Sequence, residues 1–214
     1  MLSPAAQKLR SLLKPLAEAT PAPALLFSGG VRSSLLASLE LERPPAAVAV
    51  VLAGEALDEP FVPEAATALG LSVLWVRLEK STLLDLLPQT IKLLRTHEPA
   101  VLRPALVAHL GILLAKEFHL GALWSGEALY LRGGKDPSLP TAAEKLGHAL
   151  GVPVHSIFHH PSLRRWWENL SPEERFFDRH GSRWDQAPFR ELLAERLPET
   201  IAFRAEQTSQ RLLF

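Results

Sequence analysis

The sequence contains no cysteine, and among its 214 residues it has only one methionine, one tyrosine and one asparagine. Without cysteine the chain forms no disulfide bond, offers no thiol nucleophile and supplies no thiolate ligand to a metal. Arginine outnumbers lysine, and together with the scarcity of asparagine this is typical of thermophilic proteins. A GC-rich genome produces the same bias, so both explanations stay open.

An excess of charge of either sign is also missing, because 23 basic residues balance 23 acidic ones. Composition therefore gives no electrostatic reason to expect nucleic acid or a membrane surface as a partner. The apolar run Leu106–Leu114 is interrupted by His109 and is too short to span a bilayer. The N-terminal residues form an amphipathic, basic run rather than a signal peptide. We expect a cytoplasmic protein.

A hydrophobic content of 47% and a charged content of 21% are those of an ordinary globular protein with a sizeable core. The length suits a single domain. We divide it into an N-terminal helix and linker at residues 1–23, a core at residues 24–160 and a helical C-terminal part at residues 161–214. The last part is rich in aromatic and charged residues, and its pair Trp166 and Trp167 is expected to have one ring buried and one partly exposed.

The first third of the chain alternates between strand and helix patterns. The residues from Ala46 to Ala53 form a continuous apolar run with β-branched residues in the middle, which is typical of a parallel strand covered on both faces. The predicted strands are 24–27, 46–53 and 72–78, and the predicted helices are 4–18, 31–41 and 58–69. This βαβαβ order predicts a doubly wound sheet.

The remaining pattern completes an α/β fold. It predicts helices at 81–95, 104–119, 141–150 and 188–196, and strands at 122–124 and 152–158. We therefore expect a five-stranded, mainly parallel sheet with helices on both faces and a helical C-terminal part.

A short stretch after the first predicted strand suits a phosphate group. The apolar run Ala24–Phe27 ends in Ser28-Gly29-Gly30, and a helical pattern begins directly afterwards. A strand that ends at a glycine turn and opens a helix directs several backbone N–H groups to one point. Taken alone, the stretch is better explained as an ordinary strand-to-helix turn.

Three further stretches follow in a fixed order. They are Leu57–Leu71, Trp124–Glu127 and Phe189–Arg204. With Ser28–Ser34, they resemble in order and spacing the motifs of the PP-loop ATP pyrophosphatase superfamily, above all the synthetase domain of asparagine synthase. The resemblance implies an adenine nucleotide alpha hydrolase-like fold.

The resemblance also implies a function. Its members bind ATP, activate a carboxylate as an acyl-adenylate and release pyrophosphate, so it implies an AMP-forming, carboxylate-amidating ligase of amino-acid biosynthesis. The family's glutaminase domain, with its N-terminal cysteine, has no counterpart in this sequence. Ammonia would therefore come from solution or from a separate subunit. The resemblance is also compatible with a homo-oligomer.

Roles for individual residues follow from the resemblance alone. It implies that phosphate oxygens are held by Ser28, Gly29, Gly30, Ser33 and Ser34. Leu26 and Leu52, at strand ends, would flank the adenine, and Ser125 and Gly126 would meet the nucleotide through their backbone. Glu127 would face the reacting centre; a carboxylate that balances a helix dipole is an equally weighted alternative.

The sequence departs from the family at its metal and pyrophosphate positions. Arg32 replaces an aspartate, Tyr130 and Leu131 replace a second acidic pair, and Gln186 and Glu206 replace lysines. Neither arginine nor tyrosine replaces the oxygen ligands that Mg²⁺ requires, so we predict no metal site. The alternative function is therefore an inactive descendant that binds a nucleotide, an anion or a partner protein.

Arg32 and Glu127 are the candidate catalytic residues. Because the changes at positions 32 and 206 are complementary in charge, we predict an ion pair between Arg32 and Glu206. The alternative is that the Arg32 guanidinium binds a phosphate directly.

Several histidines lie close together in the sequence near residue 160. They are His155, His159, His160 and His180. His159 and His160 are adjacent and precede a predicted helix, so their imidazoles point apart, and surface or helix-start roles are favoured over metal binding.

Overall fold

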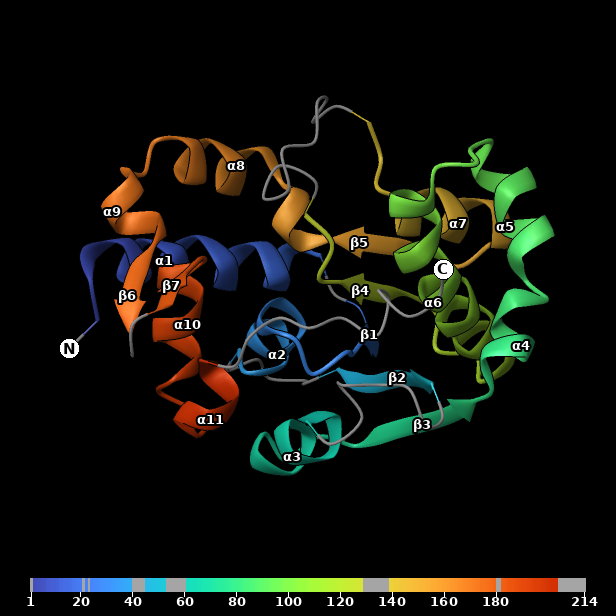
Figure 1. Cartoon of the computed structure of the whole chain (residues 1–214), viewed down its shortest axis with the longest axis horizontal. Coiled ribbons are helices and arrows are strands. Elements are labelled where there is room, and N and C mark those ends of the chain that lie inside the picture. The colour runs from blue at the N-terminus through green and yellow to red at the C-terminus, as the bar shows by residue number, and fades with distance from the viewer. Residues whose placement is uncertain are drawn as a thin grey trace.

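The computed structural model describes residues 2–20, 22, 24–39, 45–52, 61–128, 139–179 and 182–203. Its centre is a five-stranded sheet in the order β3-β2-β1-β4-β5, and all four strand pairings are parallel (Figure 1). The strands are β1 (Ala24–Leu26), β2 (Ala46–Leu52), β3 (Val73–Leu78), β4 (Leu123–Ser125) and β5 (Val154–Ser156). The predicted α/β fold with a five-stranded parallel sheet is confirmed.

The strand order reverses direction between β1 and β4. From β1 the chain proceeds outward to β2 and β3, and it then returns to place β4 on the other side of β1, with β5 beyond it. Leu25 of β1 lies opposite Trp124 of β4, so the carboxyl ends of these two strands are neighbours. Such a reversal is the topological switch point of an open α/β sheet.

Helices cover both faces of the sheet. Alternate strand residues point to opposite faces, so Leu25 and Trp124 join one apolar cluster and Ala24 and Leu123 join another. The first cluster is completed by α1 (Pro4–Ala19), α2 (Val31–Ala37), α3 (Phe61–Ala68), α8 (Pro161–Glu168) and α10 (Ala187–Leu193). The second is completed by α6 (Pro99–Glu117) and α7 (Ala142–Leu150).

The structure corrects two predicted helices. The helix predicted at 81–95 is two helices, α4 (Lys80–Leu84) and α5 (Leu87–Leu94), because Pro88 lacks the N–H that would continue the helical hydrogen bonds from α4 into α5. The next helix was predicted to start at Pro104 but begins at Pro99, which occupies its first turn, where a proline is tolerated.

The C-terminal part contains strands as well as helices. An antiparallel pair, β6 (Phe177–Arg179) and β7 (Ser182–Trp184), lies between α9 (Pro172–Arg175) and α10. The sequence did not predict these strands, since three residues are too few for a visible alternation. A short helix, α11 (Glu199–Ala202), follows α10, and β5 ends at Ser156, where a 3₁₀ turn (Ile157–His159) begins.

The C-terminal part is attached to the core through aromatic side chains. The ring of Phe189 lies 5.5 Å from that of Phe158 and 5.7 Å from that of Trp167, measured between centroids. Trp167 is buried while Trp166 is partly exposed, as predicted. The indole N–H of Trp124 donates to the carbonyl oxygen of Thr20 at 2.7 Å, which attaches the end of α1 to the inner strand β4.

Of the helices in the described residues, α6 alone is long and apolar enough to cross a membrane by length and composition. In the fold it packs against β1, β2, α5 and α7 (Figure 1). A close contact joins it to the sheet: a Cβ added at Gly111 would lie 2.5 Å from Leu26 Cδ2. These contacts are those of a core helix.

Among the described residues, the histidine that is buried in the core is His109 of α6. The Thr90 hydroxyl donates to the carbonyl oxygen of Leu86 at 2.9 Å, so it accepts from His109 Nδ1 at 2.8 Å. The opposite ring nitrogen, Nε2, has no hydrogen-bond partner and the residue is fully buried. Burial disfavours the imidazolium and lowers the pKa of His109 below its usual value of 6.5.

We predict that His109 makes the fold sensitive to acid. Because its pKa is lower in the folded state, the unfolded chain takes up a proton first, and stability is lost as pH falls below about 6.5 toward the folded-state pKa. The loss from this one group is at most about 1.4 kcal/mol per pH unit. The free energy of unfolding, measured with urea, should fall less between pH 7.5 and pH 5.5 in His109→Gln than in the wild type. The exposed His148→Gln serves as control; equal pH effects in all three proteins would refute the prediction.

Candidate functional site

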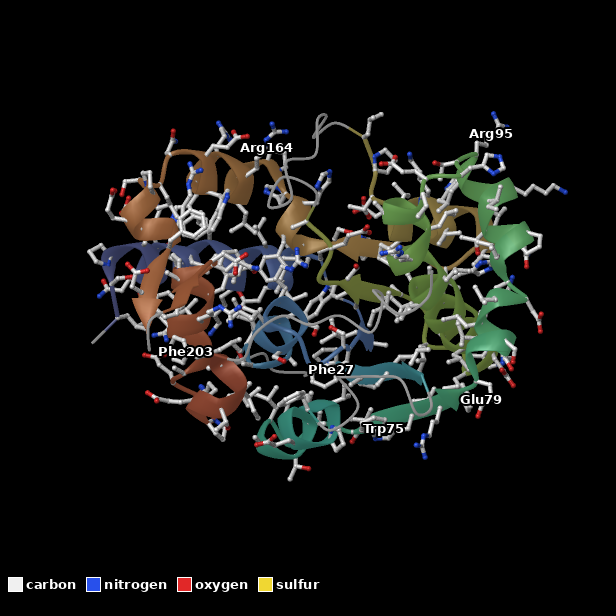
Figure 2. All side chains as sticks on the ribbon, viewed as in Figure 1. Phe27, Trp75, Glu79, Arg95, Arg164 and Phe203 are labelled. Atoms are coloured by element: carbon white, nitrogen blue, oxygen red, sulfur yellow. The ribbon has the colours of Figure 1, made fainter. Side chains whose placement is uncertain are left out.

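The loop after β1 has a shape that only glycine permits. Phe27, which Figure 2 labels, donates its N–H to the carbonyl oxygen of Val48 at 2.8 Å, and the chain then leaves the sheet. Gly29 has a φ of +64°, and a Cβ added to it would lie 3.1 Å from Cα of Val62 in α3. Gly30 is the N-cap of α2. The loop therefore depends on Gly29 both for its backbone conformation and for its close approach to α3.

Two serine hydroxyls close this loop upon itself. Ser33 Oγ donates to the carbonyl oxygen of Gly30 at 3.2 Å and accepts from the Ser28 N–H at 3.3 Å. The two hydroxyl oxygens are 3.1 Å apart, and Ser28 Oγ also accepts from the Gly30 N–H at 3.3 Å. Since the Ser33 proton is directed to Gly30, the Ser28 hydroxyl donates to Ser33. The structure thus gives Ser33 a loop-closing role.

The residues predicted to bind phosphate differ in their exposure to solvent. Ser28 is exposed and Gly30 is partly exposed, whereas Gly29 and Ser33 are buried. Ser34 is fully buried and its hydroxyl has no hydrogen-bond partner. The groups within reach of a ligand are therefore those of Ser28 and Gly30, together with the backbone at the start of α2.

The loop after β4 touches the start of α2. A Cβ added at Gly126 would lie 3.2 Å from the backbone nitrogen of Ser33 and 3.3 Å from Cβ of Arg32. The glycine allows this approach, because any side chain would meet the first turn of the helix. The Ser-Gly-Glu loop therefore meets the first turn of α2, directly after the Ser-Gly-Gly loop, at the switch point of the sheet.

Glu127 extends from this contact toward α7. Its N–H donates to Ser125 Oγ at 3.1 Å, and its carboxylate Oε2 accepts from the N–H of Ala143 at 3.1 Å. Ala143 lies in the first turn of α7, where backbone N–H groups lack partners within the helix. The carboxylate therefore caps a neighbouring helix while the residue itself stays beside the switch point.

A capping box completes this arrangement. Thr141 Oγ1 accepts from the N–H of Glu144, and Glu144 Oε2 accepts from the N–H of Thr141 at 2.8 Å. Glu144 Oε1 also accepts from the N–H of Ser156 at the end of β5. Sequence reasoning did not single out these residues, although Thr-x-x-Glu before an apolar run is a capping-box signature. They fix α7 between the ends of β4 and β5.

Arg32 occupies the contact between the two loops. It is the one residue of α2 that is partly exposed, since the other six are buried. A guanidinium has only N–H donors and does not coordinate a cation. Among the described residues no group of three His, Cys, Asp or Glu could hold a metal ion. The described residues therefore do not fit the Mg²⁺ that the family resemblance implies.

Other predicted positions have mixed outcomes. Leu26 is half-buried against Gly111. β2 ends at Leu52, whose side chain is not described. Tyr130, Leu131 and Glu206 lie outside the described residues. The ion pair between Arg32 and Glu206 therefore stays a prediction. Gln186 is buried at the N-cap of α10.

The histidines near residue 160 have structural contacts. His160 Nδ1 accepts from the N–H of Ser162 and caps α8, which confirms the predicted helix-start role for this residue. His159 Nε2 lies 3.0 Å from the carbonyl oxygen of Leu139. His180 lies outside the described residues.

Arg190 has a role that sequence reasoning missed. It is 1% exposed, and its Nε donates to the carbonyl oxygen of Asp185 at 3.0 Å. Its Nη1 donates to the carbonyl oxygen of Ala202 at 3.1 Å. Arg190 thus joins α10 to α11, so this part of the Phe189–Arg204 motif has a structural role.

No family model and no curated protein matches the chain. Among solved structures, it is similar to a glutamine-dependent NAD⁺ synthetase from Acinetobacter baumannii in complex with ADP. The TM-score is 0.51 and the identity 15%, over 94% of this chain and 36% of the synthetase. The chain spans about a third of that enzyme's length, so the likeness concerns the fold.

Two further structures have lower scores. One is a predicted subunit of tRNA methyltransferase from Methanocaldococcus jannaschii, with a TM-score of 0.44 and 20% identity over 86% of this chain and 93% of the other. The other is NMN synthetase from Francisella tularensis, with a TM-score of 0.41 and 16% identity over 81% of each chain. The shared feature is the fold, an α/β domain with a five-stranded parallel sheet.

Proposed function

We propose that this protein binds ATP at the switch point between β1 and β4, with the phosphates against the Ser-Gly-Gly loop. One observation carries the proposal. The loop that follows β4 touches the helix that follows the adjacent strand β1, because Gly126 packs directly on Arg32 and Ser33 in the first turn of α2. Open α/β sheets bind their ligands outside the carboxyl ends of the strands at such a reversal.

The choice of ATP rests on the fold and on the sequence resemblance. The synthetase of similar fold is described in complex with ADP. The resemblance to the PP-loop superfamily gives the adenine a place beside Leu26 and Leu52, at the ends of the adjacent strands β1 and β2. Backbone groups of Ser125 and Gly126 complete the proposed contacts on the β4 side.

We further propose that the bound ATP is not used for Mg²⁺-dependent adenylation. Charge stabilisation by a metal is worth several kcal/mol in phosphoryl chemistry. Arg32 stands where the family has a metal-binding aspartate, and the described residues hold no substitute set of ligands. This favours a nucleotide-binding protein that descends from the ligases without their reaction.

The second candidate is the AMP-forming, carboxylate-amidating ligase related to asparagine synthase. It is favoured by Glu127, which stands beside the switch point where the resemblance places a residue facing the reacting centre. Ammonia would then come from solution or from a separate subunit. A homo-oligomeric state and a cytoplasmic location remain predictions under either function.

A pyrophosphate-release assay distinguishes the two functions. With Mg-ATP, aspartate and ammonium, we expect no release above the rate without protein, and the same result for Glu127→Gln. Turnover by the wild type that Glu127→Gln abolishes would overturn the non-catalytic proposal in favour of the ligase. Unfolding of each protein should be followed in parallel, because Glu127 also caps α7.

A further inference from the structure

We infer that this site selects nucleotide polyphosphate that is free of Mg²⁺, with the Arg32 guanidinium in the place of the metal ion. The inference rests on the proposed ATP site and adds the ionic form of the ligand. It starts from Arg32, whose guanidinium cannot coordinate Mg²⁺ and which stands where the PP-loop superfamily has a metal-binding aspartate.

The position of Arg32 is fixed by its neighbours on both sides. Its Cβ lies 3.3 Å from where a Gly126 Cβ would be, so the side chain leaves the backbone at the contact between the two loops. Val31 and Ser33, its neighbours in α2, are both buried. Arg32 is therefore the side chain through which α2 can reach a ligand held by these loops.

The described charges around this contact are few. In residues 27–37 the one charged side chain is Arg32, and in residues 126–128 it is Glu127. The Glu127 carboxylate is bound to the N–H of Ala143 in α7. Among the described residues, the phosphate position thus has a cation beside it and no pair of carboxylates that would attract a divalent ion.

These charges favour the metal-free anion. Guanidinium groups form short, charge-assisted hydrogen bonds to phosphate oxygens. A Mg²⁺ ion bound to the polyphosphate would occupy the same oxygens, neutralise two of the negative charges and repel Arg32. Free ATP should therefore bind more tightly than Mg-ATP, the reverse of the preference that an aspartate at position 32 would give.

Isothermal titration with ATP tests this inference, in EDTA and in excess MgCl₂ at equal ionic strength. We expect the wild type to bind several-fold more tightly in EDTA. Arg32→Ala should weaken binding in EDTA roughly tenfold, as for one lost hydrogen bond to a charged group, and should remove the difference between the buffers. Arg32→Asp should bind better with Mg²⁺ than without it. Arg165→Asp makes the same charge change on an exposed part of α8 and should behave like the wild type.

The outcomes separate the inference from the proposed function. Wild-type binding that requires Mg²⁺ would overturn the inference and leave the ATP site standing. An unchanged affinity in Arg32→Ala would also overturn it, in favour of a structural ion pair for Arg32. Absence of ATP binding in both buffers would overturn the site and the inference together. The comparison of buffers needs no variant, so it decides the question even if Arg32→Asp fails to fold.

Discussion

Gly29→Val is expected to lower the affinity for ATP at least tenfold while the chain still folds. Gly29 has a φ of +64°, a conformation that costs a residue with a side chain about 1–2 kcal/mol. The valine Cβ would also lie 3.1 Å from Cα of Val62, and this backbone atom cannot rotate away. The loop must therefore move, and the groups of Ser28 and Gly30 move with it.

Gly70→Val is the matched control for this change. Gly70 has a nearly identical φ of +63°, but nothing lies within 4 Å of an added Cβ. Both variants should be destabilised by the same strain, as thermal unfolding would report, and only Gly29→Val should lose ATP in a titration. A folded Gly29→Val that binds ATP like the wild type would show that the loop does not form the site.

Arg190→Ala is expected to destabilise the fold by about 3 kcal/mol or more. The guanidinium is 1% exposed and donates to the carbonyl oxygens of Asp185 and Ala202. Hydrogen bonds from a charged donor contribute about 1.5–3 kcal/mol each, and truncation also removes the partner of the buried Ala202 carbonyl group. Urea unfolding measures the loss, and α11 should detach before the sheet unfolds.

Two comparisons test the geometry of this prediction. Arg190→Lys keeps the charge but lacks the planar fork that reaches two carbonyl groups. Its free energy of unfolding should therefore lie between those of Arg190→Ala and the wild type. Arg165→Ala, on an exposed part of α8, should change stability by less than about 0.5 kcal/mol. Equal stabilities of Arg190→Ala and Arg165→Ala would contradict the role assigned to Arg190.

Local sequence patterns were sufficient for much of the fold. The helix predicted at 141–150 is found as α7, because Thr141 caps its start and Gly151, with a φ of +76°, ends it. The strand predicted at 46–53 is found as β2, whose continuous apolar run is that of a buried parallel strand. Both elements carry their signals within a few residues of their ends.

Features that depend on contacts distant in sequence were not predictable. β6 and β7 have three residues each and are defined by pairing with one another rather than by a pattern. The Glu127 carboxylate reaches the N–H of Ala143, which lies 16 residues further along the chain. The approach of Gly126 to α2 follows from the strand order, which a single sequence does not state. The loops could therefore be located from the sequence, whereas the contacts between them required the structure.

A crystal structure of the protein grown with ATP and EDTA tests the central claim most directly. We expect the phosphates against Ser28 and the backbone of Gly30, with the guanidinium of Arg32 on a phosphate oxygen and the adenine beyond the ends of β1 and β2. A nucleotide bound away from the loops that follow β1 and β4, or an ATP-saturated solution that yields crystals with this position empty, would contradict it.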